Sequence, residues 1–154
     1  VREGFAGVTS PGRLELVRRT PSVLVDAAHN PAGAHVLAEA VADAFTFTRL
    51  VGVVAILDDK DAVGVLEALE PVLAEVVVTR SSSPRAIDPE ELGRLAEDVF
   101  GHDRVRVAPD LPSALDLAVT VAEESGAVVG AGVLVTGSVT VAGEARQLLL
   151  RSRG

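Results

Sequence analysis

The chain has 154 residues, a formal net charge of −8 and a pI of about 4.8, and 48% of its residues are hydrophobic. These values predict one folded domain with a substantial core rather than a disordered segment. The acidic balance argues against nucleic acid or an anionic membrane as the main partner. The absence of cysteine excludes disulfides, thiolate metal sites and cysteine nucleophiles. The apolar runs are too short to span a bilayer and no signal peptide opens the chain, so we expect a cytoplasmic protein.

Short apolar runs alternate along the chain with longer stretches in which apolar residues recur with a helical period. The predicted strands cover residues 23–26, 51–57, 75–79, 104–107 and 133–136, and the predicted helices cover residues 31–45, 62–73, 88–100, 112–124 and 139–150. Residues 14–17 are expected to form one further strand that pairs back on residues 23–25. This alternation predicts an α/β fold with a mostly parallel sheet, helices on both faces and one antiparallel edge strand.

Ligand-binding residues are expected at one edge of this sheet, because parallel sheets bind ligands at the carboxyl ends of their strands. Polar residues lie where the predicted strands end, around Asp26, Leu57, Thr79 and Thr136. Motifs that hold phosphate groups are missing: the only lysine, Lys60, follows an aspartate, so no GxxxxGK[ST] loop exists, and no glycine-rich dinucleotide fingerprint follows a strand. A domain with this sequence that uses ATP therefore does not hold the phosphate groups by itself.

The segment Asp26-Ala27-Ala28-His29-Asn30-Pro31 gives the strongest positive signal. A predicted strand ends on a carboxylate, a histidine follows in the loop, and Asn30 and Pro31 are residues that typically begin a helix. Asp26 and His29 would then lie beside a helix N-terminus, where a carboxylate can accept ribose hydroxyls and an imidazole can reach an anion. The alternative is that Asp26 only caps the loop and that His29 binds no ligand, and the pattern alone leaves both interpretations open.

Other short motifs carry weaker signals. Arg13 follows a Pro-Gly turn and could contact phosphate oxygens, although a solvated surface arginine is the simpler interpretation. Lys60 lies among aspartates, where it could bind a carboxylate substrate or belong to a solvated loop in which Asp61 caps a helix. Ser138, in Thr-Gly-Ser, could cap the last helix or help to form an anion site. Residues 81–86 are most simply a surface loop.

Taken in order, several of these motifs resemble those of one family. They are Pro11-Gly12-Arg13-Leu14-Glu15, Asp26-Ala27-Ala28-His29-Asn30-Pro31, Asp59-Lys60-Asp61, Pro84-Arg85-Ala86 and Thr136-Gly137-Ser138. This succession, which runs from about Pro11 to Arg146, resembles the C-terminal domain of folylpolyglutamate synthases and bifunctional dihydrofolate synthases, in the Mur ligase superfamily. The Asp-x-Ala-His-Asn-Pro element separates the resemblance from the cell-wall Mur ligases. The resemblance implies a Rossmann-like sheet of the type found in the C-terminal domain of Mur ligases.

The resemblance implies an ATP-dependent amide ligase. Members of this family use ATP to convert the carboxylate of a pterin-bearing substrate, folate or dihydropteroate, into an acyl phosphate, which the amino group of L-glutamate then attacks. The phosphate-binding loop and the Mg²⁺ ligands belong to an N-terminal domain of the same polypeptide, which this chain lacks. Residues 1–10 would be a linker trailing from that domain, and residues 11–154 would be the C-terminal ligase domain, inactive alone. No nucleic acid or membrane partner is expected.

The resemblance also assigns roles to residues of this chain. Arg13 would contact the ATP phosphates, Asp26 would bind the ribose or adenine side of ATP, and His29 would lie between the nucleotide and the incoming glutamate. Lys60 would bind a carboxylate of glutamate with help from Ser138, and His29 and Lys60 would be the catalytic residues. No residue of this chain is expected to bind a metal. The alternatives are the C-terminal domain of a cell-wall Mur ligase and a non-catalytic module that binds an anionic small molecule.

Overall fold

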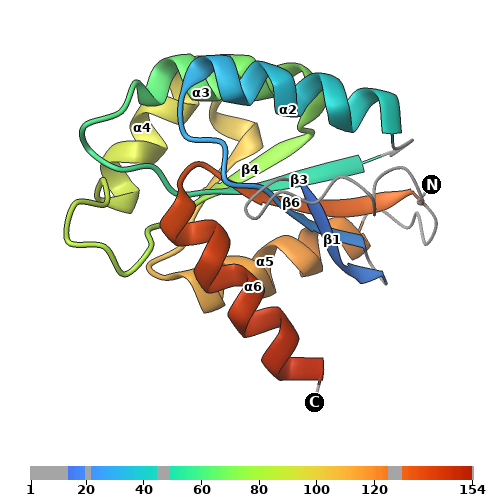
Figure 1. Cartoon of the computed structure of the whole chain (residues 1–154). Helices are drawn as coiled ribbons and strands as arrows, with labels where there is room; N and C mark the ends of the chain where they lie inside the picture. The colour runs from blue at the N-terminus through green and yellow to red at the C-terminus, as the bar shows by residue number, and fades with distance from the viewer. Residues whose placement is uncertain (1–13, 20–21, 45–48, 125–129, 154) are drawn as a thin grey trace.

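The computed structural model describes residues 14–19, 22–44, 49–124 and 130–153. Within these ranges a six-stranded sheet has the order β1-β2-β6-β3-β4-β5 (Figure 1). The strands are β1 (Glu15–Arg19), β2 (Ser22–Val25), β3 (Arg49–Val54), β4 (Glu75–Val78), β5 (Val105–Val107) and β6 (Ala131–Thr136). β1 pairs antiparallel with β2, and every other neighbouring pair is parallel. The predicted parallel sheet and its antiparallel edge strand are both confirmed.

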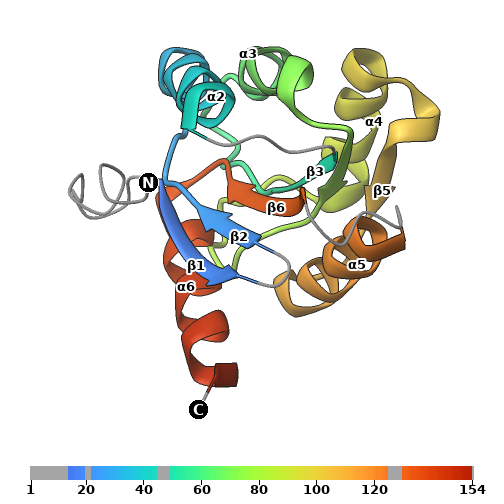
Figure 2. The same ribbon diagram turned by 90° about the vertical axis from the view of Figure 1, so that its right-hand side faces the viewer.

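Helices cover both faces of the sheet, as predicted (Figure 2). One face carries α2 (Pro31–Ala44), α3 (Ala62–Leu69) and α4 (Pro89–Phe100), and the other carries α5 (Leu111–Glu124) and α6 (Val139–Arg153). Successive side chains of a strand point to opposite faces, so Val53 packs with α5 and α6 whereas Val54 packs with α2, α3 and α4. Because the central strands are covered on both sides, they are apolar at nearly every position. In the described part of the chain, no helix is long and apolar enough to cross a membrane.

Most element boundaries differ from the prediction by a few residues, and three of these differences have a cause that the structure shows. β3 ends at Val54 instead of residue 57, because the Ile56 carbonyl oxygen accepts a hydrogen bond from Ile87 N (3.0 Å) and Leu57 forms an isolated antiparallel bridge with Ala86. The chain thus leaves the sheet to pair with the loop after β4. α3 ends at Leu69 instead of residue 73, because Pro71 has no N–H to continue the helix, and a 3-10 turn follows. Residue 104 likewise belongs to a 3-10 turn before β5.

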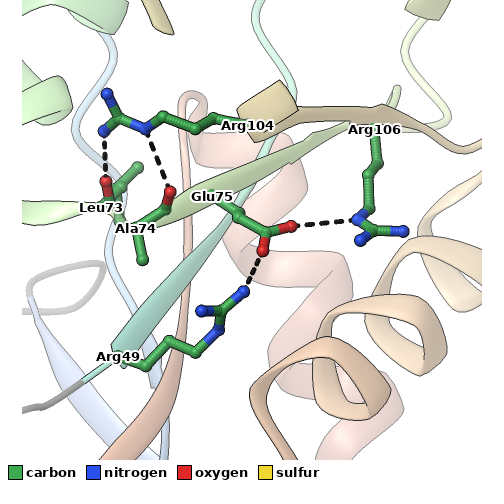
Figure 3. Close-up of polar contacts among 6 residues, drawn as sticks. All are labelled: Arg49, Leu73, Ala74, Glu75, Arg104 and Arg106. Atoms are coloured by element: carbon green, nitrogen blue, oxygen red, sulfur yellow. Dashed lines mark hydrogen bonds and ion pairs between the residues drawn. The ribbon is translucent and has the colours of Figure 1, made fainter. Parts of the chain in front are cut away.

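A polar network lies at the edge of the sheet where the parallel strands begin, opposite the edge formed by their carboxyl ends (Figure 3). Glu75, the first residue of β4, is 9% exposed and receives hydrogen bonds from the guanidinium groups of Arg49 and Arg106. Arg104 donates to the backbone carbonyls of Leu73 (2.7 Å) and Ala74 (3.1 Å), and it also pairs with the Glu70 carboxylate at 2.9 Å. Arg104 thereby satisfies carbonyl groups that the end of α3 and its 3-10 turn leave without helical partners.

Substitution of Arg104 by alanine is expected to lower the free energy of unfolding by about 2 kcal/mol, because it strips hydrogen bonds from half-buried carbonyl groups and a charged partner from Glu70. The guanidinium also lies 5.0 Å from the centre of the Phe100 ring, a contact that alanine removes. Urea unfolding of the chain measures the change, and Arg94→Ala, at an exposed position on α4, is the matched control. Equal stability of the two variants would show that water replaces the arginine at these carbonyls.

Candidate functional site

The topology itself marks one place at the carboxyl edge of the sheet. The neighbouring strands β2 and β6 are followed by helices on opposite faces: α2 packs with Leu24 and Leu134, whereas α6 packs with Val133 and Val135. In open parallel sheets, ligands bind in the crevice outside the carboxyl ends of the strands at such a reversal. The loops after β2 and β6 line this position, and β3 is the other neighbour of β6 (Figure 1).

The loop after β2 is held by its own polar side chains. The Asp26 carboxylate accepts a hydrogen bond from Ala28 N (2.8 Å), and Asn30 Oδ1 accepts one from Gly33 N (2.7 Å) at the start of α2. His29 Nδ1 lies 3.1 Å from the Ala27 carbonyl oxygen. A carbonyl oxygen can only accept, so Nδ1 carries the proton of this hydrogen bond and Nε2 is the ring nitrogen left for a ligand. The predicted capping role of Asn30 is confirmed, and the imidazole is oriented by the backbone.

The turn after β6 is bonded directly to the His29 loop. Gly137 N donates to the Ala28 carbonyl oxygen (3.1 Å), and Thr136 Oγ1 lies 3.5 Å from the same atom. Ser138 is 1% exposed, and its Oγ accepts a hydrogen bond from Val141 N (3.1 Å), which makes it the N-cap of α6. The hydroxyl can still donate one hydrogen bond. The structure therefore brings the segments of Asp26, His29 and Ser138 together, through their backbones.

Lys60 lies in the loop between β3 and α3, the third segment at this edge. Lys60 N donates to the Leu57 carbonyl oxygen (3.1 Å), and Asp61 caps α3 by accepting a hydrogen bond from Gly64 N (2.9 Å). The loop is joined to the others because Ala55 N donates to the Thr136 carbonyl oxygen (3.2 Å). Lys60 itself is half-buried and, among the residues that the structure describes, it forms no ion pair. Its ammonium group is therefore available to an anion.

Carboxylates surround Lys60, and they would oppose the binding of an anion if their charges were unmatched. The lysine lines a cavity of about 380 Å³ together with Asp58, Asp61, Asp88 and Glu91. Asp61 and Asp88 are engaged at the N-termini of α3 and α4, where the helix dipole favours negative charge. Part of the negative charge around Lys60 is thus matched locally, so the Lys60 ammonium group can still bind an anion.

Sequence reasoning missed the contacts that tie the loop after β4 to its neighbours. Ser82 donates to the Glu144 carboxylate on α6 through its backbone N (3.1 Å) and through its hydroxyl. Arg85 forms an ion pair with Asp59, the residue before Lys60. Partial loss of hydration raises the pKa of the Asp59 carboxyl, but the hydrogen bond and charge of Arg85, with the charge of Lys60, outweigh this and leave the pKa below its usual value. Residues 81–86, predicted to form a surface loop, therefore link segments of the candidate site.

Two further predictions concern the site. Arg13 lies outside the described residues, so its contact with phosphate groups stays a prediction. The described ranges contain no group of three or more His, Cys, Asp or Glu side chains that could hold a metal ion. The ligand-binding roles of Asp26, His29, Lys60 and Ser138 also stay predictions, now with an arrangement that places their segments at one edge of the sheet.

Comparison with known proteins finds relatives that share this fold. Residues 12–139 match the family described as Mur ligase, glutamate ligase domain. A dihydrofolate synthase/folylpolyglutamate synthase of Mycobacterium tuberculosis is 52% identical over 98% of this chain, which covers 33% of that protein. The solved structure of the M. tuberculosis folylpolyglutamate synthase complexed with ADP superposes with a TM-score of 0.88, at 53% identity, over 96% of this chain and 34% of that one.

A more distant structure has the same fold. Escherichia coli FolC in complex with DHPP and ADP superposes with a TM-score of 0.80 at 26% identity, over 99% of this chain and 34% of that one. The chain thus spans about a third of the length of each of these three relatives. The family match covers most of the sequence and both motif-bearing loops around His29 and Lys60. The chain belongs to the Mur ligase family, as its glutamate ligase domain.

Proposed function

We propose that this chain is the glutamate-binding, C-terminal part of an ATP-dependent dihydrofolate synthase/folylpolyglutamate synthase. The observation that carries the proposal is the 52% identity to such an enzyme along nearly the whole chain, including the loops of the candidate site. The cell-wall ligase alternative is less well supported, because the Asp26–Pro31 segment has the form typical of the folate enzymes. The reaction joins the amino group of L-glutamate to an activated carboxylate of folate or dihydropteroate.

In this proposal the loop after β2 binds the nucleoside side of ATP. The Asp26 carboxylate can accept hydrogen bonds from ribose hydroxyls but would repel phosphate groups, so it suits the sugar and not the phosphates. The Ala27 carbonyl oxygen orients the His29 ring through Nδ1, which leaves Nε2 as the ring nitrogen that would lie between the nucleotide and the incoming glutamate. Arg13 would supply positive charge to the phosphates. ATP would supply the phosphoryl group that activates the substrate carboxylate.

The loops after β3 and β6 bind glutamate. Lys60 would hold a carboxylate of the amino acid, and the Ser138 turn, bonded to the His29 loop through Gly137, would fix the distance between glutamate and nucleotide. Such positioning lowers the barrier by bringing the amino group to the activated carbon in an attack geometry. An acyl phosphate reacts with water, so a second domain has to close over this edge during the reaction.

We propose that Mg²⁺ and the phosphate-binding loop come from an N-terminal domain of the same polypeptide. The residues described here do not fit a metal site, since no three potential ligands gather among them. The nearby carboxylates are already engaged, Asp61 and Asp88 as helix caps and Asp59 in an ion pair, so residues of the N-terminal domain would hold Mg²⁺, which would supply positive charge to the ATP phosphates.

Glutamate-dependent release of ADP tests the proposal. The full-length protein is expected to release ADP when given ATP, Mg²⁺, glutamate and either dihydropteroate or a reduced folate, and each folate substrate is assayed separately to assign the specificity. The isolated chain is expected to release none under the same conditions. Activity of the isolated chain, or a folded full-length protein that binds ATP but uses neither folate substrate, would contradict the proposal.

A further inference from the structure

The Pro84-Arg85-Ala86 motif has no role in the function proposed above, yet its place in the fold is well defined. Residues 85–87 run antiparallel to residues 56–58: Asp58 N donates to the Arg85 carbonyl oxygen (2.8 Å), and Ile87 N donates to the Ile56 carbonyl oxygen (3.0 Å). This short ladder fixes the Arg85 backbone beside the loop that carries Asp59 and Lys60. The guanidinium group meets the Asp59 carboxylate there.

Two cations compete for the Asp59 carboxylate. Arg85 holds it in an ion pair and a hydrogen bond, and Lys60, the next residue along the chain, also attracts it, although more weakly. Lys60 makes no ion pair within the described ranges. An arginine matches a carboxylate with its planar fork of donors better than an ammonium group does. Arg85 is therefore the ion-pair partner of Asp59, and in the described part of the chain the Lys60 ammonium group is left without a carboxylate partner.

We propose that Arg85 is a positioning residue: by occupying the Asp59 carboxylate, it keeps the Lys60 ammonium group available for the carboxylate of the substrate. The inference rests on the proposed function, in which Lys60 binds glutamate. Without Arg85, the nearest cation to Asp59 is Lys60, and glutamate has to displace an internal carboxylate before it binds. The pair thus acts on substrate affinity through Lys60, with no contact between Arg85 and glutamate.

The size of the effect follows from the exposure of the pair. The side chains of Arg85 and Asp59 are 55% and 46% exposed, so their ion pair contributes little to folding. An Asp59–Lys60 contact at the same place would be similarly weak, and a competitor of that strength raises the KM for glutamate by about fivefold. Once glutamate has displaced it, Lys60 is in the same position as in the native protein. We therefore expect kcat to change by less than about twofold.

A double-variant cycle in the full-length protein tests the inference, with ADP release measured against glutamate concentration. Arg85→Gln is expected to raise the KM for glutamate about fivefold at nearly constant kcat. Asp59→Asn removes the competing charge and is expected to leave the KM no higher than that of the native protein. The combined Arg85→Gln/Asp59→Asn variant is expected to return to the native KM. Arg94→Gln, which removes an exposed arginine of α4 outside these loops, is the control for net charge.

Each other outcome overturns the inference. If the combined variant keeps the raised KM, Arg85 contacts the substrate itself. If Asp59→Asn raises the KM as much as Arg85→Gln does, the pair holds the loop in place and does not release Lys60. Lys60→Ala separates this inference from the proposed function. If Lys60→Ala does not raise the KM for glutamate, Lys60 is not in the glutamate site and both proposals about it fail. If it does raise the KM but the combined Arg85→Gln/Asp59→Asn variant does not return to the native KM, only the role of Arg85 is overturned. Thermal unfolding of every variant shows that the fold is retained.

Discussion

Replacement of Lys60 by alanine in the full-length enzyme is expected to lower kcat/KM for glutamate by about 10²-fold, the loss typical of removing one fixed charge partner from a substrate anion. Lys60 is half-buried on a loop between β3 and α3, where it makes no ion pair with any described residue. Alanine leaves the cap of α3 and the turn around Leu57 in place, because both depend on Asp61 and on backbone atoms. The loss therefore concerns binding, and initial rates of ADP release at varied glutamate measure it.

Two controls make this result specific to glutamate. The KM for ATP of Lys60→Ala is expected to stay near its native value, because the loop after β2 and not Lys60 is proposed to bind the nucleoside. Lys60→Arg keeps the charge on a bulkier, differently shaped group and is expected to retain more activity than Lys60→Ala. A native kcat/KM in Lys60→Ala would remove this residue from the site, and an equal rise in both KM values would point to a distorted loop.

The fold could be predicted because most of its determinants are local. Continuous apolar strands, helices of period 3.6 and caps such as Asp61 and Ser138 are each legible within a few residues of sequence, and the structure confirms both caps. The place of the site followed from the same pattern, since parallel strands bring their carboxyl ends to one edge. The boundary errors arose where the chain pairs with a distant segment, as Leu57 does with Ala86.

The links between loops could not be predicted, because they join exposed polar residues far apart in the chain. Ser82 and Glu144 are 62 residues apart, and neither belongs to a periodic apolar pattern. The Arg85–Asp59 pair connects two loops whose sequences alone describe solvated surface. The pairing of Glu75 with Arg49 and Arg106 likewise depends on the order of β3, β4 and β5 in the sheet. Only the sheet order brings such residues together, and the resemblance to a known family, which assigned roles to other residues, predicted none of these contacts.

Gly137→Ala is expected to destabilise the fold strongly, with a loss of about 3–5 kcal/mol in the free energy of unfolding. Gly137 has a φ of +118°, a conformation that costs an L-residue energy. An added Cβ would lie 2.5 Å from the Ala55 carbonyl oxygen, a backbone atom of the chain that leaves β3. That segment cannot move aside cheaply, because Ala55 N is bonded to the Thr136 carbonyl oxygen and the side chain of Ala55 is buried.

Two glycines separate the causes of this loss. Gly101 also has a positive φ, +90°, but an added Cβ meets nothing within 4 Å, so Gly101→Ala is expected to cost only the backbone strain, about 1–3 kcal/mol. Gly143 lies in α6 with open space around it, and Gly143→Ala is expected to stabilise by about 0.5–1 kcal/mol. Urea unfolding of the three variants gives the order of the losses, and a Gly137→Ala loss no larger than that of Gly101→Ala would mean that the turn relaxes around the new methyl group.

If the larger loss is found, the same clash also disturbs the hydrogen bond from Gly137 N to the Ala28 carbonyl oxygen, which joins the Ser138 turn to the His29 loop. Gly137 is then needed both for the close approach of the turn to Ala55 and for the link between the proposed nucleotide and glutamate loops.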